Sequence, residues 1–352
     1  MTEDVLLTRE GGALIITLNR PKALNALSLE MIRVITPALR EAASDPAVTF
    51  VIIEGTGERA FCAGGDVRAV ALATKDPESR LPSDFFREEY ILNHLIHTYP
   101  KPFVALVQGI CMGGGVGLSV HGSHRVVAEN NLTFAMPETG IGLFPDVGAT
   151  WMLTRCPGAT GMYLALTGAR LGSADAYYVG YATHIVRDED FAGVRAALLA
   201  AQPKDEAAVD AVLATFMRRV LSVAPLAPNR PAIDRCFSLG SIEAILAALR
   251  IEATSWAEEQ RAILATKSPT SLKVTFEQIW GGKDLSIEEV FQREFRMTQR
   301  FMASGEFYEG IRALLIDKDG KPAWNPASLD QVNGNDVADY FLPLSDGELT
   351  FS

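Results

Sequence analysis

The chain is poor in the residues from which metal sites and disulfide frameworks are built. Its 352 residues include only four cysteines and five histidines, and none of them stands at a spacing typical of metal ligands. We therefore expect no metal ion. We also expect the scattered cysteines to be free thiols that pack in the interior of the protein.

An excess of positive charge is missing as well. The formal net charge is -11 at pH 7 and the isoelectric point is about 5.1. Proteins that bind nucleic acids use lysine and arginine to neutralise phosphates, so we expect no nucleic-acid partner. A few local cations would still suffice for a small anionic ligand.

Long apolar runs are also lacking, and the first residues lead us to expect no N-terminal leader. Asp, Glu, Arg or Gly interrupts every apolar stretch before it reaches the length of a bilayer-spanning helix, so we expect no membrane partner. The first ten residues, MTEDVLLTRE, resemble neither a secretory signal nor an arginine-rich transit peptide. These features predict a cytoplasmic location.

The composition that is present is typical of a globular protein, with 48% apolar and 21% charged residues. Apolar and polar patterns alternate between strands and helices in the first half, which predicts an α/β fold with a largely parallel sheet. Strands are expected at 13–18, 50–54, 102–108, 125–128 and 182–186, with helices at 29–42 and 84–97.

The second half changes character, because no strand pattern stands out after residue 188. Alanine-rich periodic segments follow one another instead. We therefore predict an α/β core at 1–188 and a helical C-terminal region at 189–352 packed on that core. Its helices are expected near 190–201, 206–220, 241–249, 253–266, 269–280, 286–302 and 307–315.

The most informative stretch runs from Gly109 to Gly148. Three glycines at 113–115 follow the apolar segment 102–108 and open a helix. The free N–H groups at such a helix start favour a phosphate or a developing oxyanion. Close packing of helix and strand would explain the same glycines. No Gly-Lys-Ser/Thr follows, and no acidic residue ends a second strand at the distance required for dinucleotide binding.

Two carboxylates, Glu138 and Asp146, follow in the same stretch. Each comes directly after a proline, which restricts the backbone around it. The apolar run 141–144 separates them, so the loop is more apolar than a surface loop needs to be. Two alternatives remain open at this point: both acids lie in solvent, or Asp146 caps a helix at 148–153.

A second glycine turn, Ala63-Gly64-Gly65-Asp66, also stands between a strand and a helix. The two turns belong to a set of long motifs that resembles the crotonase, or enoyl-CoA hydratase/isomerase, superfamily over essentially the whole chain. The motifs are FCAGGDV at 61–67, FFREEY at 85–90, MGGGVGLSVHG at 112–122, FAMPETGIGLFPDVG at 134–148, SPTSLK at 268–273 and EGIRALLIDKDGKPAWNP at 309–326, together with Asn19-Arg20-Pro21 and Asn25-Ala26-Leu27.

The resemblance implies a fold and a chemistry. The fold would be a spiral of repeated β-β-α units, extended here by the helical C-terminal region. The backbone N–H groups of Gly65 and Gly114 would form the oxyanion hole for the thioester of an acyl-coenzyme A. Coenzyme A would be part of the substrate, so no separate cofactor is expected.

Within the superfamily, the motifs are most similar to those of hydrolases of short 3-hydroxyacyl-CoA thioesters, with 3-hydroxyisobutyryl-CoA from valine degradation as the expected substrate. The resemblance makes Glu138 and Asp146 catalytic, with Glu138 acting as nucleophile or as general base. Glu89 would contact the substrate. The path of coenzyme A would be lined by Lys22, Ala23, Leu24, Ala63 and Asp66.

Gly117 favours a hydrolase over a hydratase among the members of the superfamily that this chain resembles. A hydratase of this superfamily carries a glutamate at that position, so one of two hydratase carboxylates is missing here. An enoyl-CoA hydratase or isomerase is the alternative function, and a non-catalytic acyl-CoA binder is a third. The sequence leaves the assembly open between a monomer and a homo-oligomer such as a trimer or hexamer.

Overall fold

The computed structural model describes residues 3–73, 78–218 and 224–351. Its contacts divide the chain into two compact units that interleave along the sequence. Unit 1 comprises residues 1–66, 91–134 and 170–227, and unit 2 comprises 67–90, 135–169 and 228–352. The boundary expected after residue 188 falls inside unit 1, and the division into 1–188 and 189–352 stays a prediction.

Unit 1 contains a seven-stranded sheet. The strands follow the order β1-β2-β3-β5-β6-β7, and β4 pairs with β5. The bounds are β1 (Val5–Glu10), β2 (Ala13–Leu18), β3 (Phe50–Gly55), β4 (Ala60–Cys62), β5 (Phe103–Met112), β6 (His124–Ala135) and β7 (His184–Val186). β1 is antiparallel to β2, whereas the β2–β3, β3–β5, β4–β5 and β6–β7 pairs are parallel. The largely parallel arrangement confirms the expected fold class.

Apolar strand residues build the core of unit 1. Ile15, Ile52 and Val104 on neighbouring strands pack in one cluster with apolar residues of α8 (Phe191–Ala201) and α9 (Glu206–Leu213). Strands buried in this way read as continuous apolar runs, which is why β2, β3 and β5 were predictable. β1 and β4 were not predicted, because β1 buries only Val5 and β4 has three residues.

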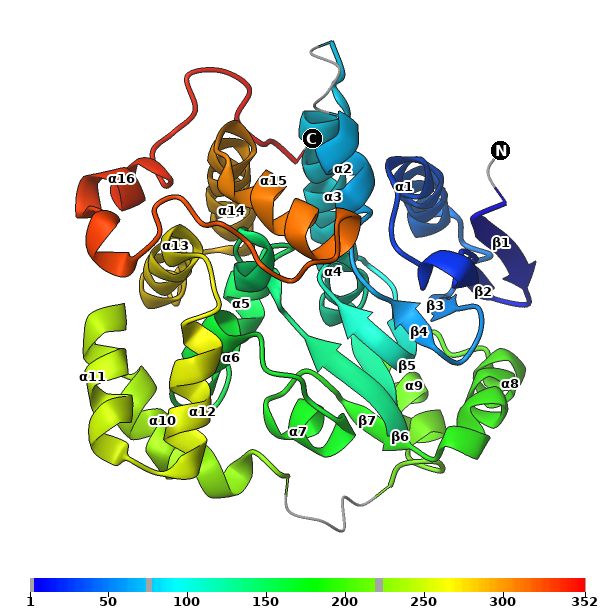
Figure 1. Cartoon of the computed structure of the whole chain (residues 1–352). Coiled ribbons are helices and arrows are strands. Elements are labelled where there is room, and N and C mark those ends of the chain that lie inside the picture. The colour runs from blue at the N-terminus through cyan, green and yellow to red at the C-terminus, as the bar shows by residue number, and fades with distance from the viewer. Residues whose placement is uncertain (1–2, 74–77, 219–223, 352) are drawn as a thin grey trace. The chain divides into compact units, whose positions relative to one another are not determined.

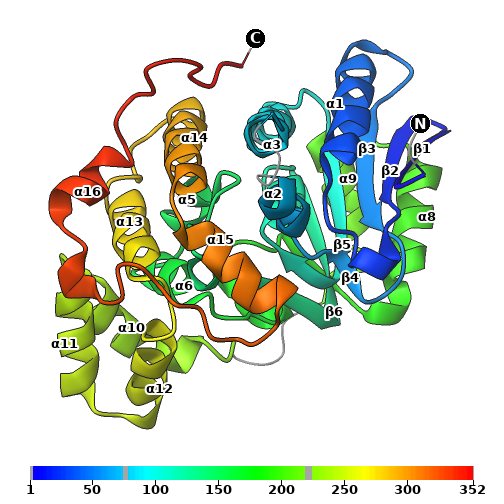
Figure 2. The ribbon, with the colours of Figure 1, turned by 45° about the horizontal axis from the view of Figure 1, so that its top comes forward.

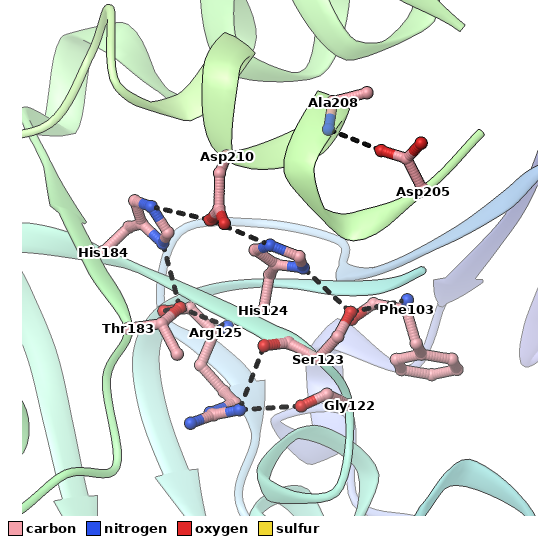
Figure 3. Close-up of polar contacts among 10 residues, drawn as sticks. All are labelled: Phe103, Gly122, Ser123, His124, Arg125, Thr183, His184, Asp205, Ala208 and Asp210. Atoms are coloured by element: carbon pink, nitrogen blue, oxygen red, sulfur yellow. Dashed lines mark hydrogen bonds and ion pairs between the residues drawn. The ribbon is translucent and has the colours of Figure 1, made fainter. Parts of the chain in front are cut away.

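Helix α9 is tied to the sheet by a polar cluster of two histidines and one aspartate (Figure 3). Asp210 of α9 lies 3.1 Å from Nε2 of His124 and 3.6 Å from Nε2 of His184. The other ring nitrogens contact the hydroxyls of Ser123 at 2.8 Å and Thr183 at 3.0 Å. Burial lowers the pKa of both histidines, and the Asp210 charge opposes that shift. The cluster fixes α9 against β6 and β7. Helix α8 lies beside α9 in Figure 1.

The remaining helices of unit 1 connect its strands. They are α1 (Leu29–Ser44), α4 (Gly114–Val120) and α7 (Ser173–Tyr178), and the C-terminal end of α3 (Leu81–His97) also belongs to this unit. Ser28 caps α1 as expected, because its hydroxyl accepts a hydrogen bond from the Met31 N–H at 3.3 Å. Such a cap stabilises a helix by about 1 kcal/mol.

In the described part of the chain, unit 2 is built from helices and short turns without a strand of its own. They are α2 (Val67–Ala73), the N-terminal part of α3, α5 (Ala149–Leu153), α6 (Thr160–Thr167), α10 (Arg230–Phe237), α11 (Ile242–Glu252), α12 (Ser255–Leu264), α13 (Pro269–Trp280), α14 (Ile287–Ala303), α15 (Glu306–Ile311) and α16 (Gly334–Asp339). Figure 1 shows α10, α11 and α12 lying together. The predicted C-terminal helices are present, but the one expected at 206–220 ends at Leu213, and residues 219–220 lie outside the described part. The short α6, α7, α10 and α16 were not predicted.

The helices share one further property. Within 3–73, 78–218 and 224–351, none has both the length and the apolar character that crossing a bilayer requires.

Candidate active site

The two glycine turns lie against each other in unit 1. β4 runs into the first turn and β5 into the second, and these strands pair in parallel. A Cβ on Gly115 would lie 2.2 Å from the backbone oxygen of Cys62, so only glycine fits there. Gly64 and Gly113 have φ values of 123° and 47°, which a side chain would strain. Close packing therefore accounts for part of the glycine pattern, as the alternative explanation had it.

Two backbone donors in these turns are free. No hydrogen bond within the described residues uses the N–H of Gly65 or of Gly114 as its donor. Gly114 is the first residue of α4, where N–H groups have no partner inside the helix. Both amides could therefore donate a hydrogen bond to a developing oxyanion. Their role in an oxyanion hole stays a prediction.

The predicted coenzyme A residues gather around the first turn. The Ala63 N–H donates to the Leu24 oxygen at 3.0 Å, and Asp66 accepts a hydrogen bond from Arg20 at 3.1 Å. Lys22 and Ala23 are exposed in a short 3-10 helix, Pro21–Ala23. The structure brings all five residues to one region of unit 1, and their contact with coenzyme A is untested.

Asn25 organises this region, although its motif alone did not mark it as a site residue. Its backbone is in the left-handed region with φ 55°, next to Leu24 with φ 53°. Its buried side chain accepts from the Arg20 N–H at 2.9 Å and donates to the Ala60 oxygen at 2.8 Å. These bonds hold the 20–25 turn against β4.

The three predicted acids are in unit 2 and are all buried. Glu89, Glu138 and Asp146 have exposed fractions of only 2%, 4% and 5%, so the interpretation as solvated loop acids is wrong. The helix-cap interpretation of Asp146 is also wrong, since α5 has Gly148 at its N-cap and no side-chain cap. The hydrogen bond to the Ala149 N–H comes from the backbone oxygen of Asp146.

Burial and mutual repulsion decide the charge of these acids. Desolvation, followed by the Asp146 charge, raises the pKa of Glu138 and of Glu89 well above the usual value. Desolvation raises the pKa of Asp146 to about 6, against the effect of a hydrogen bond from Tyr90. Asp146 is thus the acid that ionises most readily, and Glu138 is a strong base once it is deprotonated.

Two carboxylate oxygens in this cluster have no hydrogen-bond partner within the described residues. Among the described residues, Oε2 of Glu138 and Oε1 of Glu89 are buried without a hydrogen-bond partner. A buried polar atom left in this state costs about 1–3 kcal/mol. A water molecule, a hydroxyl or a reacting carbonyl would fit the chemistry of such a place.

Tyr90 fixes the side chain of Asp146. Its hydroxyl lies 2.7 Å from Oδ2 of Asp146 and 2.7 Å from the hydroxyl of Thr298. The ring is fully buried and packs against Phe291 and Phe295 of α14. Sequence reasoning missed Tyr90, although it directly follows Glu89 in the FFREEY motif.

Glu138 opens a 3-10 turn, Glu138–Ile141, which the C-terminal helices support. The Ser268 N–H, at the start of α13, donates to the Thr139 oxygen at 3.1 Å, and the Ser268 hydroxyl bonds to Glu306. A Cβ on Gly310 would lie 2.3 Å from the Ile141 oxygen, so α15 approaches the turn backbone to backbone. Figure 2 shows α15 beside α14, which supports the Asp146 loop.

Fold and site now define the class of protein. Residues 13–341 match the enoyl-CoA hydratase/isomerase family, a span that includes both glycine turns and all three acids. The chain belongs to this family, which confirms the resemblance read from the motifs.

Particular relatives narrow the comparison. The mitochondrial 3-hydroxyisobutyryl-CoA hydrolase of Xenopus tropicalis is 49% identical over 350 residues, covering 98% of this chain and 90% of the relative. The human protein of the same name is 45% identical over 354 residues, covering 99% of this chain and 91% of the relative.

Two solved structures share the fold over nearly the whole chain. A carnitinyl-CoA dehydratase from Mycobacterium thermoresistibile has a TM-score of 0.92 at 41% identity, with 99% of each chain covered. An enoyl-CoA hydratase from Rhodobacter sphaeroides 2.4.1 has a TM-score of 0.91 at 39% identity, covering 99% of this chain and 100% of that chain.

One expectation is overturned by the comparisons. The cytoplasmic location expected from the N-terminal residues is wrong, because the curated relatives are named as mitochondrial proteins.

Proposed function

We propose that this protein hydrolyses the thioester of 3-hydroxyisobutyryl-CoA to 3-hydroxyisobutyrate and coenzyme A, a step of valine degradation. The observation that carries the proposal is the buried set of acids, in which Glu138 keeps a free oxygen and Tyr90 fixes Asp146. Curated relatives named 3-hydroxyisobutyryl-CoA hydrolase, 44–49% identical over nearly the whole chain, support the substrate.

Glu138 acts on the thioester carbonyl. Either its carboxylate oxygen bonds to the carbonyl carbon, giving a mixed anhydride that water then hydrolyses, or it takes a proton from the attacking water. In both routes the C–S bond breaks and the coenzyme A thiolate leaves and takes up a proton. Because its pKa is raised, the ionised Glu138 carboxylate is a stronger base, but a smaller fraction of it is ionised at a given pH.

The charge that develops on the thioester oxygen needs donors. We assign this task to the N–H groups of Gly65 and Gly114, on the strength of their position in the two glycine turns and their lack of another partner within the described chain. Preformed donors of this type contribute roughly 3–4 kcal/mol each to the stability of the transition state.

Asp146 orients the attacking water or accepts a hydrogen bond from the 3-hydroxyl of the substrate. A carboxylate accepts from a hydroxyl, and the pKa of about 6 leaves Asp146 mostly ionised at neutral pH. Glu89, whose pKa is raised well above the usual value by burial and by the neighbouring acids, shares the second task.

A hydratase is the second candidate, because the two solved structures at 41% and 39% identity carry the names dehydratase and hydratase. Gly117 opposes it. This residue is buried inside α4, at the position where a hydratase of the family has its additional glutamate. Without that carboxylate, water addition to an enoyl thioester lacks one of its two acid–base groups.

One experiment separates the candidates. The purified protein is assayed for thiol release from 3-hydroxyisobutyryl-CoA, isobutyryl-CoA and acetyl-CoA, and for loss of the enoyl absorbance of crotonyl-CoA. We expect thiol release to be fastest with 3-hydroxyisobutyryl-CoA. Efficient hydration of crotonyl-CoA with no thiol release would replace the hydrolase by a hydratase.

A further inference from the structure

A fourth buried acid lies in unit 2 outside the group that acts on the substrate. Glu294 of α14 is completely buried. Its carboxylate accepts from the Gly148 N–H at 2.7 Å, the Thr150 N–H at 3.1 Å and the Thr150 hydroxyl at 2.6 Å. The amide nitrogen of Gln278 lies 3.4 Å from the same carboxylate. All of these groups are donors, so they favour the ionised form of the carboxylate, whereas burial favours the protonated form.

Burial raises the pKa of Glu294 to about 8, and the hydrogen bonds from Thr150 and Gly148 oppose the rise. The Gln278 amide also donates to the Thr150 hydroxyl at 2.8 Å, so the proton of that hydroxyl is directed toward Glu294. A protonated Glu294, or a glutamine in its place, would bring its own O–H or N–H donor next to the donors of Gly148 and Thr150.

Glu294 holds a strained turn. Val147, between Asp146 and Gly148, has φ 57°, a conformation that a β-branched residue rarely adopts. Such a strained residue persists only when its surroundings over-determine it. Glu294 binds the N–H that follows Val147, and Gln278 donates to the Pro145 oxygen at 2.6 Å before it. The turn is thus held on both sides of Asp146.

The same helix also holds the side chain of Asp146. Thr298 stands one turn beyond Glu294 on α14, and its hydroxyl contacts the Tyr90 hydroxyl that bonds to Asp146. Thr298 donates its own proton to the backbone oxygen of Glu294 at 2.8 Å. Helix α14 therefore controls the backbone and the carboxylate of Asp146 through neighbouring residues.

We infer that Glu294 is a positioning residue for the reaction: it fixes the strained turn 145–150 so that the carboxylate of Asp146 is aimed at the water or hydroxyl it binds. The inference rests on the proposed function, because it assumes that Asp146 takes part in hydrolysis. Glu294 is placed to act through the turn that carries Asp146, and its charge also adds to the rise in the pKa of Glu138.

The test is a double-mutant cycle between Glu294→Gln and Asp146→Asn, with kcat and KM for 3-hydroxyisobutyryl-CoA as readouts. We expect Glu294→Gln to lower kcat about 10- to 100-fold, at or below the lower end of a general-base contribution, with KM changed less than about threefold. In the Asp146→Asn background the same substitution should cost less than about threefold, because residues that act as a unit are not additive.

A matched control is Glu259→Gln, which alters an exposed glutamate of α12 in the same unit and should leave kcat unchanged. If Glu294→Gln fails to fold in a thermal unfolding scan, Thr150→Val replaces it. That variant keeps the shape and the backbone donors but removes the hydroxyl, and its kcat loss should likewise vanish in the Asp146→Asn background.

The outcomes are distinguishable. Losses that multiply in the double variant, or wild-type kcat in Glu294→Gln and in Thr150→Val, would overturn the positioning role. Absence of thiol release by the unmodified protein would instead remove the proposed function itself.

Discussion

The hydroxyl of Tyr90 donates a hydrogen bond to Oδ2 of Asp146 at 2.7 Å, in a place where both residues are almost fully buried. The bond stabilises the ionised form of Asp146 and opposes the effect of desolvation on its pKa. The pKa of Tyr90 is itself raised well above the usual value, so the tyrosine remains a donor throughout the working pH range.

This bond leads to a prediction for Tyr90→Phe. Removing the donor raises the pKa of Asp146 above about 6, since the charged form loses its partner. Activity should already decline as Glu138, whose pKa is raised well above the usual value, becomes protonated. Protonation of Asp146 should add a further fall near pH 6 in the unmodified protein, and this second fall should lie at a higher pH in the variant. The measurement is kcat/KM against pH for both proteins. An acid limb that stays in place or moves to lower pH would contradict the role given to Tyr90.

Replacing Glu138 with Gln removes the nucleophile or base and keeps the shape. We expect hydrolysis to fall by at least ~10²-fold, the scale of general-base loss, with acyl-CoA binding largely retained. Stopped-flow thiol release gives the rate, and calorimetric titration with a non-hydrolysable acyl-CoA analogue gives the affinity. Turnover at the level of the unmodified protein would exclude Glu138 from the mechanism.

Asp146→Asn tests substrate selection. A site built to bond a hydroxyl rejects the analogue without it, because its own polar group is left unpaired. We therefore expect kcat/KM to fall most for 3-hydroxyisobutyryl-CoA. The ratio of its kcat/KM to that of isobutyryl-CoA should then decrease. If both substrates lose the same fraction of activity, Asp146 acts on the water and does not read the hydroxyl.

Gly117→Glu restores the hydratase pair of carboxylates in sequence only. Gly117 lies in α4 between the fully buried side chains of Val116 and Leu118, and an unpaired charge there is costly. We expect little hydration of crotonyl-CoA, followed as loss of enoyl absorbance, and a lower melting temperature. A stable variant with rapid hydration would show that one missing carboxylate alone separates the two activities.

The histidine cluster predicts how stability depends on pH. Because burial lowers the folded-state pKa of His124 and His184, the folded form binds fewer protons than the unfolded one. Their contribution is fully present above the unfolded value of about 6.5 and is lost as pH falls through the lowered folded values. Asp210→Asn removes the charge that opposes the lowering of the two histidine pKa values. The free energy of unfolding of this variant should therefore fall more than that of the unmodified protein as the pH is lowered.

Urea unfolding at a series of pH values between about 5 and 8 measures this effect, since the free energy of unfolding follows the proton balance. The control is the pair His124→Gln and His184→Gln, in which the dependence between pH 5 and 6.5 should flatten. The same slope in all variants would mean that other groups control acid stability.

The sequence by itself determined what depends on local signals. Ser28 capped its helix and the apolar runs at β2, β3 and β5 became buried strands, because capping and apolar periodicity act over a few residues. The two glycine turns were predictable for the same reason, since glycine tolerates a φ that other residues avoid. The family followed from those motifs and not from composition.

Only the tertiary structure decided how the site works. The sequence could not tell solvated acids from buried ones, because burial depends on the helices that pack around Glu138 and Asp146. Tyr90 and Asp146 are 56 positions apart, and Gly148 and Glu294 are 146 apart, so no local pattern connects them. From sequence alone, an acid on an amphipathic helix such as α14 is predicted to face solvent, because the donors that bind it lie far away in the sequence. The ionisation of these carboxylates is therefore a property of the fold, since desolvation and long-range hydrogen bonds control it.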